Sequence, residues 1–145
     1  MKKIVALASD HAGFKLKEEI KDYLTELGYD TVDLGPNTDN ASVSYAEKGK
    51  ELAEYVDSRH PDFGVAVCGT GLGISYALNR HKHIRAARVV SVEDAHLAKL
   101  HNDANVLCFG GRQINFNQAK EMIDEYLKTT YEGGRHQLRI EELDK

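Results

Sequence analysis

A run of alternating glycines, Cys68-Gly69-Thr70-Gly71-Leu72-Gly73, carries the strongest chemical signal in the chain. Closely spaced glycines let several backbone amides point into one concavity, and such a nest before a helix binds anions. Ile74 stands where a dinucleotide fingerprint needs glycine and a cysteine phosphatase loop needs arginine, and the run has no Walker Gly-Lys-Ser/Thr. The pattern therefore predicts either an anion-binding loop of another kind or a plain tight turn with a buried cysteine.

Cys68 and Cys108 are the two cysteines of the chain. Cys68 ends an apolar stretch beside the glycine amides and a helix start, a setting that favours the thiolate. Cys108 lies between two apolar residues, and we interpret it as a core residue. Two cysteines are too few for a disulfide framework and indicate a reducing, cytoplasmic setting.

Two polar pairs interrupt apolar segments. Asp10 and His11 close a fully apolar stretch, and we interpret the pair as a candidate functional site. The alternative is that Asp10 caps the helix that follows. His101 and Asn102 end a helical stretch, where histidine also serves as an ordinary stop signal at the negative helix terminus. No spacing of histidines and cysteines along the chain resembles a zinc site.

Arg135 and Arg139 are four residues apart and would share one helical face. Two stacked guanidinium groups repel unless an anion lies between them, and phosphate suits them because guanidinium binds it bidentately. The alternative is a solvated helix in which Glu141 and Glu142 neutralise the two arginines. Arg112, after the pair Gly110-Gly111, is a third candidate anion ligand.

The elements that must position these residues follow from apolar periodicity, which alternates between strand and helix five times. We expect strands near residues 4–8, 29–34, 63–67, 85–90 and 105–109, and helices near 16–27, 45–56, 74–80, 92–100, 117–129 and 135–145. Such alternation predicts a single three-layer α/β domain over residues 1–145, with a five-stranded parallel sheet between helices and a C-terminal helix. We expect the strand order 2-1-3-4-5 and a ligand site beyond the carboxyl ends of the strands.

Composition limits the classes of partner. The chain has 145 residues, of which 41% are hydrophobic and 29% charged, as in a globular protein. With 23 acidic and 19 basic residues the formal net charge is −4, so general binding to nucleic acid or an anionic membrane is not expected. No apolar run reaches the 18 residues of a membrane span. Any bound anion must therefore be held by a local cluster of donors.

Together these residues resemble the ribose-5-phosphate isomerase B family, with its relatives the galactose-6-phosphate isomerase subunits. The motifs that carry the resemblance lie in order along the whole chain: Ser9-Asp10-His11-Ala12-Gly13, Cys68-Gly69-Thr70-Gly71-Leu72-Gly73, His101-Asn102-Asp103-Ala104-Asn105-Val106 and Glu132-Gly133-Gly134-Arg135-His136. The resemblance implies a flavodoxin- or Rossmann-like fold. It also implies interconversion of an aldose phosphate and its ketose through an enediolate, without a metal or organic cofactor.

Carried over position by position, the resemblance implies that Cys68 removes the C2 proton and that His101 opens the sugar ring. It implies that the enediolate oxygen meets the amides of the glycine run, which includes Gly69, Gly71, Leu72 and Gly73. The hydroxyl partners would be Asp10, Thr70 and Asn102, with Tyr45 as a wall of the site. The phosphate ligands would be His11, Arg112, Arg135 and Arg139.

Two features refine the expected substrate. Cys68 together with Ile74 matches the branch of the family that uses cysteine, rather than glutamate at position 74, as the base. Galactose-6-phosphate isomerase has two unlike subunits, one typically without the cysteine and the other without the Gly-Gly-Arg-His ending, whereas this chain has both. However, Ser44-Tyr45-Ala46 replaces the family's usual Asp-Tyr-Pro, which bears on the length of sugar accepted.

We therefore expect a cytoplasmic enzyme of the pentose phosphate pathway that interconverts D-ribose 5-phosphate and D-ribulose 5-phosphate. The alternatives are the same reaction on a six-carbon sugar (allose 6-phosphate or galactose 6-phosphate) and a non-catalytic sugar-phosphate sensor. The resemblance further implies a homodimer, or a pair of dimers, with shared active sites. In that dimer the Cys68 loop would face His101, Asn102 and Arg112 of the other subunit.

Overall fold

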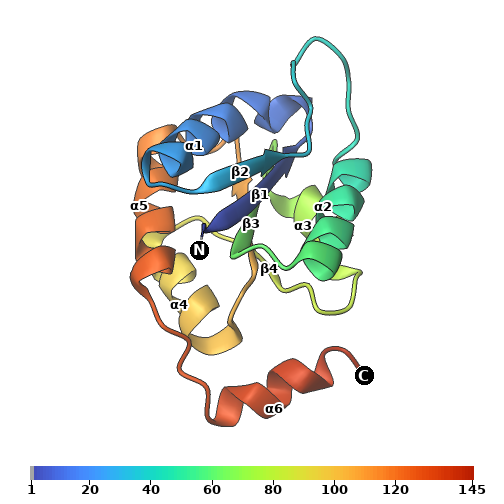
Figure 1. The fold of residues 1–145 in the computed structure, drawn as a ribbon. Helices are drawn as coiled ribbons and strands as arrows, with labels where there is room; N and C mark the ends of the chain where they lie inside the picture. The colour runs from blue at the N-terminus through green and yellow to red at the C-terminus, as the bar shows by residue number, and fades with distance from the viewer. Residues whose placement is uncertain (1) are drawn as a thin grey trace.

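The computed structural model describes residues 2–145 and shows one parallel sheet between two layers of helices (Figure 1). In chain order the elements are β1 (Ile4–Ser9), the 3-10 turn η1 (His11–Gly13), α1 (Phe14–Glu26), β2 (Asp30–Asp33), α2 (Tyr45–Arg59), β3 (Phe63–Cys68), α3 (Leu72–Asn79), β4 (Ala86–Arg88), α4 (Val92–Asn102), β5 (Val106–Gly110), α5 (Phe116–Lys128) and α6 (Arg135–Glu142). The predicted fold class and every predicted element are confirmed, and most boundaries move by one to three residues.

The strand order corrects one expectation. The sheet runs β2-β1-β3-β5-β4, so β5 rather than β4 lies beside β3. Residues Gly64 to Cys68 pair with Val106 to Gly110, which sets the end of β5 directly beside the end of β3. The loops after β1, β3 and β5 therefore meet at one edge of the sheet, as expected for the ligand site, while β4 occupies the outer position.

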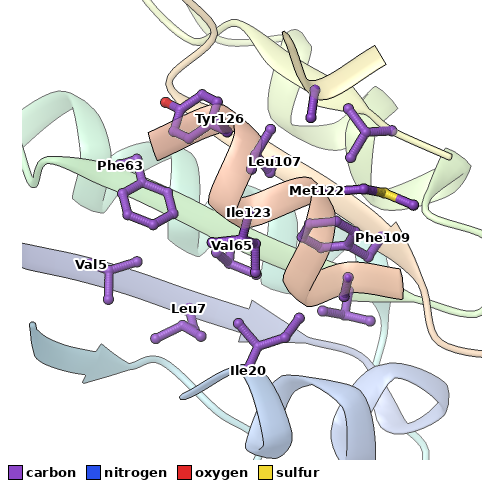
Figure 2. Packing of buried hydrophobic residues seen from close by; sticks show 14 of the residues in the cluster. Val5, Leu7, Ile20, Phe63, Val65, Leu107, Phe109, Met122, Ile123 and Tyr126 are labelled. Atoms are coloured by element: carbon purple, nitrogen blue, oxygen red, sulfur yellow. The ribbon is translucent and has the colours of Figure 1, made fainter. Parts of the chain in front are cut away.

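The central strands are buried on both faces, because helices cover each side of the sheet. On one face Val5, Leu7, Val65 and Phe109 pack against α1, α4 and α5 (Figure 2). On the other face the residues from alternate positions of the same strands, such as Ala6, pack against α2 and α3. Two apolar clusters therefore hold the sheet rigid, and the loops at its carboxyl edge start from fixed positions.

Local signals in the sequence start and stop these helices. Side chains of Ser44, Ser91 and Asn115 accept hydrogen bonds from amides in the first turns of α2, α4 and α5. Such caps satisfy amides that have no partner within the helix. Gly28 follows α1 with φ +97°, a backbone conformation that favours glycine. The Ser44 cap fixes the start of α2, where Tyr45 is the first helical residue.

Helix α6 lies apart from the sheet and packs mainly along α4 (Figure 1). The Glu132 amide donates to the Leu100 carbonyl at 2.9 Å, which fastens the segment before α6 to the end of α4. One side of α6 is buried through His136 and Ile140, whereas Leu138 and Leu143 are about two-thirds exposed. Helix α6 and its C-cap residue Leu143 therefore present apolar side chains that residues 2–145 of their own chain leave uncovered. None of the helices in the described part of the chain has the length and apolar character needed to cross a bilayer.

Candidate active site

A cleft of about 560 Å³ opens at the carboxyl edge of the sheet. That size lies within the range of small-molecule sites, roughly 300–1,000 Å³. Eight of the residues singled out in the sequence line it: Asp10, His11, Tyr45, Cys68, Gly69, Thr70, Gly73 and Arg112. Ala12, Val43, Ser44 and Tyr76 complete the lining.

Backbone hydrogen bonds join the loops that follow β3 and β5. The Gly111 amide donates to the Cys68 carbonyl at 2.8 Å, and the Arg112 amide donates to the Gly69 carbonyl at 3.0 Å. The Arg112 guanidinium lies beside the glycine run, because Nη1 is 3.4 Å from where a Cβ on Gly69 would stand. The expectation that Arg112 reaches the Cys68 cleft from another subunit was therefore wrong, since Arg112 lines the cleft of its own chain.

Cys68 is the last residue of β3, and its thiol is held beneath the glycine run. The Gly71 amide donates a hydrogen bond to Cys68 Sγ at 3.1 Å. Gly71 has φ +80° and is the N-cap of α3, so the turn that aims this amide at the sulfur needs a residue without a side chain. Cys68 is almost fully buried but still lines the cleft. The sulfur is therefore both reachable from the cleft and stabilised by a backbone donor.

Not all five amides of the run point into the cleft. The Gly71 amide is taken by Cys68 Sγ, and the Leu72 amide donates to Thr70 Oγ1 at 3.2 Å. Gly71 and Leu72 lie outside the cleft lining, whereas Gly69, Thr70 and Gly73 belong to it. An oxyanion in the cleft would therefore meet a smaller set of donors than the sequence suggested.

Cys108 has a different environment, as its apolar neighbours predicted. It is fully buried in the middle of β5 and pairs across the sheet with Ala66. Burial raises the pKa of the Cys108 thiol far above its ordinary value, and nearby Cys68 contributes in the same direction. Cys108 is therefore a packing residue that stays protonated.

Tyr45 packs directly on the glycine run. A Cβ built on Gly73 would stand 2.6 Å from the Tyr45 ring, which is closer than real Cβ atoms approach. The ring thus requires glycine at position 73 and lies against the first turn of α3. About half of Tyr45 remains exposed, so the ring forms an outer wall of the cleft.

Asp10 and His11 line the cleft from the end of β1. Asp10 Oδ1 accepts a hydrogen bond from the Gly13 amide at 3.0 Å, so the capping role and the site role coexist in one carboxylate. His11 Nδ1 lies 3.1 Å from the Val43 amide. The Val43 carbonyl lies 3.3 Å from the same nitrogen, so Val43 fixes the ring without deciding its tautomer. When Nδ1 accepts from the amide, or when the ring is protonated, Nε2 carries an N–H that can bind an anion.

Arg88, at the end of β4, was not singled out in the sequence. Its Nε donates to the Thr70 carbonyl at 3.1 Å and its Nη2 to Gln113 Oε1 at 2.8 Å. Arg88 therefore ties the glycine run to the loop that carries Arg112. The sequence signal was weak, because one arginine near a strand end is most often solvated. Tyr76 was also missed, although it lies one helical turn beyond the glycine run and lines the cleft.

A fully buried lysine holds the loop that leads to Tyr45. Lys17 Nζ donates to Asp33 Oδ1 at 2.7 Å, to the Pro36 carbonyl at 3.0 Å and to Glu18 Oε2 at 3.0 Å. Burial would raise the pKa of the Asp33 carboxyl, but hydrogen bonds from Lys17, Lys21 and the Gly35 amide outweigh it and lower that pKa below its usual value. The network fixes one end of the loop between β2 and α2, and His11 holds Val43 at the other.

His101 and Asn102 do not join the cleft of their own chain. They end α4, which returns to the amino edge of the sheet before β5 starts at Val106. Gly110 pairs with Cys68 at the other edge, and β5 alone spans about 13 Å at roughly 3.3 Å per residue. We expected His101 to lie far from Cys68 of the same chain, but the reason given was wrong. The distance between them arises along the strands, and β4 does not lie between them.

Arg135 and Arg139 lie on α6, near His101 and away from the cleft. The His101 and His136 rings are stacked, with centroids 4.5 Å apart and an interplanar angle of 21°. Arg135 Nη1 is 3.6 Å from Glu132 Oε1 and its side chain is two-thirds exposed. The predicted site residues thus form two groups in one chain, one around Cys68 and one around His101.

Comparison with known proteins agrees with this architecture. The model of the Ribose/Galactose Isomerase family matches residues 5–143. Ribose-5-phosphate isomerase B of Escherichia coli is 41% identical over 143 residues, which cover 99% of this chain and 95% of that protein. The solved structure of ribose 5-phosphate isomerase from Thermotoga maritima superposes with a TM-score of 0.95 at 42% identity, covering 99% of each chain.

A structure of ribose-5-phosphate isomerase B from Mycoplasma genitalium with bound ribulose 5-phosphate superposes with a TM-score of 0.93 at 39% identity. The match covers 99% of this chain and 95% of that one. Family model, sequence relatives and solved structures agree over nearly the full length. The chain therefore belongs to the Ribose/Galactose Isomerase family, with the ribose-5-phosphate isomerase B proteins.

Proposed function

We propose that the protein interconverts D-ribose 5-phosphate and D-ribulose 5-phosphate. The observation that carries this proposal is the placement of the Cys68 thiol under the Gly71 amide, in a cleft that Gly69, Thr70 and Gly73 of the glycine run also line. A thiol base and preorganised donors are what proton transfer next to a carbonyl requires. The relatives named above support a five-carbon sugar phosphate as the substrate.

In the proposed reaction, the Cys68 thiolate takes the proton from C2 of the open-chain aldose. The C–H electron pair forms the C1–C2 double bond, and the carbonyl pair moves onto O1, where the amides of Gly69, Thr70 and Gly73 stabilise the charge. Cys68 then returns its proton to C1, while the proton on O2 moves to solvent as the C2 carbonyl forms and O1 is protonated. Atoms and electrons balance within the substrate, so the step needs no oxidant or reductant.

Phosphate binding and ring opening would together need residues of the group around Cys68 and of the group around His101. His11 and Arg112 offer N–H donors within the cleft, and Arg135 and Arg139 would add theirs from another subunit. His101 of that subunit would move the proton between the ring oxygen and O1, because the cyclic sugar has no free carbonyl until the ring opens. Asp10, Thr70 and Asn102 would bind hydroxyl groups.

A homodimer with two shared sites would bring the residues around Cys68 of one subunit next to the residues around His101 of the other. The separation of His101 from Cys68 within one chain supports this assembly, since a two-fold axis can bring one subunit's His101 to the other's cleft. Apolar side chains exposed on α3, α4 and α6, among them Tyr76, Leu97 and Leu138, supply surface for such an interface. Cys68 and Cys108 are free thiols, which is typical of a protein that works in the cytoplasm.

The test is to offer the purified protein ribose 5-phosphate, allose 6-phosphate and galactose 6-phosphate and to follow each ketose directly. We expect the highest kcat/KM for ribose 5-phosphate and loss of turnover in Cys68→Ala. A hexose phosphate as the best substrate would redirect the proposal to the six-carbon reaction. Binding of all three sugars without turnover would replace it with a sensor.

A further inference from the structure

Three side chains of types that can bind metals meet where the end of α4 contacts the start of α6. They are His101, Glu132 and His136, and one donor atom of each lies within 4.8 Å of the others. The sequence showed no zinc spacing, because 31 positions separate His101 from Glu132 and the fold alone brings them together. Only Glu132 and His136 follow one another closely.

The backbone positions this cluster. The Glu132 amide donates to the Leu100 carbonyl at 2.9 Å, which places Glu132 beside the last turn of α4. His136 is buried in the first turn of α6, and its Nε2 lies 3.3 Å from Glu132 Oε1. His136 is therefore the fixed donor, whereas exposed Glu132 and half-buried His101 can turn without disturbing the core.

Two imidazoles and one carboxylate make a donor set that suits zinc and leaves a fourth position open. Tetrahedral zinc with bonds of about 2.0–2.1 Å holds its ligand atoms about 3.3 Å apart. His136 Nε2 and Glu132 Oε1 already have this separation. His101 must leave its stacked position on His136 so that a nitrogen faces the same point.

One positive charge competes for the carboxylate. Arg135 lies 3.6 Å from Glu132 Oε1, but its side chain is 66% exposed, and ion pairs of this kind contribute little. A divalent cation bound to three side chains can therefore displace the guanidinium from Glu132.

We propose that His101, Glu132 and His136 bind Zn²⁺ and that the bound ion switches off isomerisation. The metal site stands on its own geometry. The inhibition rests on the proposed function, because Zn²⁺ would occupy the nitrogen lone pair with which His101 exchanges the ring-opening proton. In this account zinc is an inhibitor and takes no part in the reaction.

Calorimetric titration of the chelator-treated full-length protein with ZnCl₂ tests the site. We expect one Zn²⁺ per chain and an affinity at least about tenfold weaker in Glu132→Gln and in His136→Gln. The matched control is His96→Gln, which changes a histidine on α4 that also faces a glutamate, Glu125, at 2.9 Å but belongs to no three-donor cluster among residues 2–145. Its affinity for Zn²⁺ should equal that of the unchanged protein.

Cobalt gives a readout that does not depend on activity. Co²⁺ in this site should give the intense visible absorption of tetrahedral coordination, and the Glu132→Gln protein should lack it. Because Glu132 is exposed, that variant tests the site even where replacing buried His136 disturbs folding. No stoichiometric binding, or binding equally strong in Glu132→Gln, would overturn the site.

Activity assays separate the site from its consequence. Zn²⁺ should inhibit turnover over the concentration range in which it binds, a chelator should restore turnover, and Glu132→Gln should need more Zn²⁺ for the same inhibition. Zinc binding without inhibition of an active enzyme would support binding by Glu132 and His136 and overturn the inhibition, since His101 would then either not bind the ion or not open the ring. Zinc binding to a protein that turns over no sugar phosphate would support the site while the proposed function fails.

Discussion

The Gly71 amide donates a hydrogen bond to Cys68 Sγ at 3.1 Å, so the glycine that starts α3 also holds the thiol at the end of β3. A sulfur held by a backbone donor has a fixed direction, and a donor stabilises a negative charge that forms on it. This pair of residues explains why a strand, a glycine run and a helix start must follow one another without a break.

Replacing Cys68 with alanine should lower kcat for ribose 5-phosphate isomerisation by about 10²–10⁴-fold, the usual contribution of a positioned acid/base group. Binding of the sugar phosphate should survive, because the phosphate donors are untouched. Steady-state turnover and calorimetric binding measure the two effects separately. Cys108→Ala is the control and should stay active, since Cys108 is buried away from the cleft. Activity of Cys68→Ala within a few-fold of the unchanged protein would remove Cys68 from the mechanism.

Gly73→Ala should damage the cleft through Tyr45. The added methyl would stand 2.6 Å from the Tyr45 ring, so the ring must move away from the first turn of α3. We expect KM to rise and kcat to fall, with little change in the free energy of unfolding, because about half of Tyr45 is exposed. In a Tyr45→Ala background Gly73→Ala should have much less effect, and a double-mutant cycle measures that coupling. Additive effects of the two changes would show that the contact does not matter.

Acid should weaken the network that holds the loop before α2. The folded protein lowers the pKa of Asp33, so the stabilisation from its charge is present above the unfolded pKa of about 3.9 and is lost as pH falls through the folded value. Asp33→Asn should lower the free energy of unfolding by about 1.5–3 kcal/mol at pH 7. That difference should shrink below about pH 4. Urea titrations at several pH values measure it.

Asp30→Asn, on the same strand, provides the control for Asp33. Asp30 pairs with Lys2 at 3.5 Å in an exposed position, and such pairs stabilise little. Its replacement should change the free energy of unfolding by less than about 0.5 kcal/mol at any pH. Equal effects of the two variants would show that the buried Lys17 ammonium does not depend on Asp33.

Exhaustive chelation should leave isomerisation unchanged or raise it. In the proposed mechanism backbone amides stabilise the charge on O1, a task that other enzymes give to a metal. The measurement is kcat after treatment with a chelator and gel filtration into metal-free buffer. Activity that disappears on chelation and returns with one divalent ion would reject the metal-free mechanism.

Much of this arrangement could be predicted from the sequence because it is local. The glycine run, the polar pair after β1 and the alternating periodicity each act within a few residues. Strand order was predicted wrongly in its last two positions. The chain pattern predicts right-handed crossovers but does not decide whether β4 or β5 takes the place beside β3.

The sequence also did not predict contacts between side chains that are far apart along the chain. Lys17 flanks the apolar stripe of α1, where a lysine usually lies in solvent. In the structure it is fully buried and bonds to Asp33 of β2 and to the Pro36 carbonyl in the loop that follows. Arg88 lies nowhere near Thr70 in the sequence, yet it bonds to the Thr70 carbonyl. The family resemblance placed the residues around Cys68 and those around His101 in one site, whereas no spacing in the chain predicted that they belong together. Contacts of this kind depend on tertiary packing, which local patterns do not contain.

Two subunits should share each active site, and hybrid dimers can test this. The Cys68→Ala and His101→Ala homodimers should both be nearly inactive, because every site lacks one group. When the two are unfolded together and refolded, half of the dimers should be hybrids, and each hybrid should contain one intact and one doubly damaged site. About a quarter of the full activity should therefore return, from the statistics of a closed two-fold dimer.

The position of Arg112 supplies a matched control for this experiment. Arg112 lines the same cleft as Cys68, so a hybrid of Cys68→Ala and Arg112→Ala chains has one damaged group in each cleft. Its activity should not exceed the mean of the two parent dimers. A mass tag on one variant confirms that hybrids form. Recovery in the first mixture and none in the second would place His101 opposite the partner's cleft and Arg112 in its own. If confirmed hybrids of the first pair stay inactive, Cys68 and His101 serve the same subunit's site, and a single chain would then have to close more than 13 Å of strand length to bring them together.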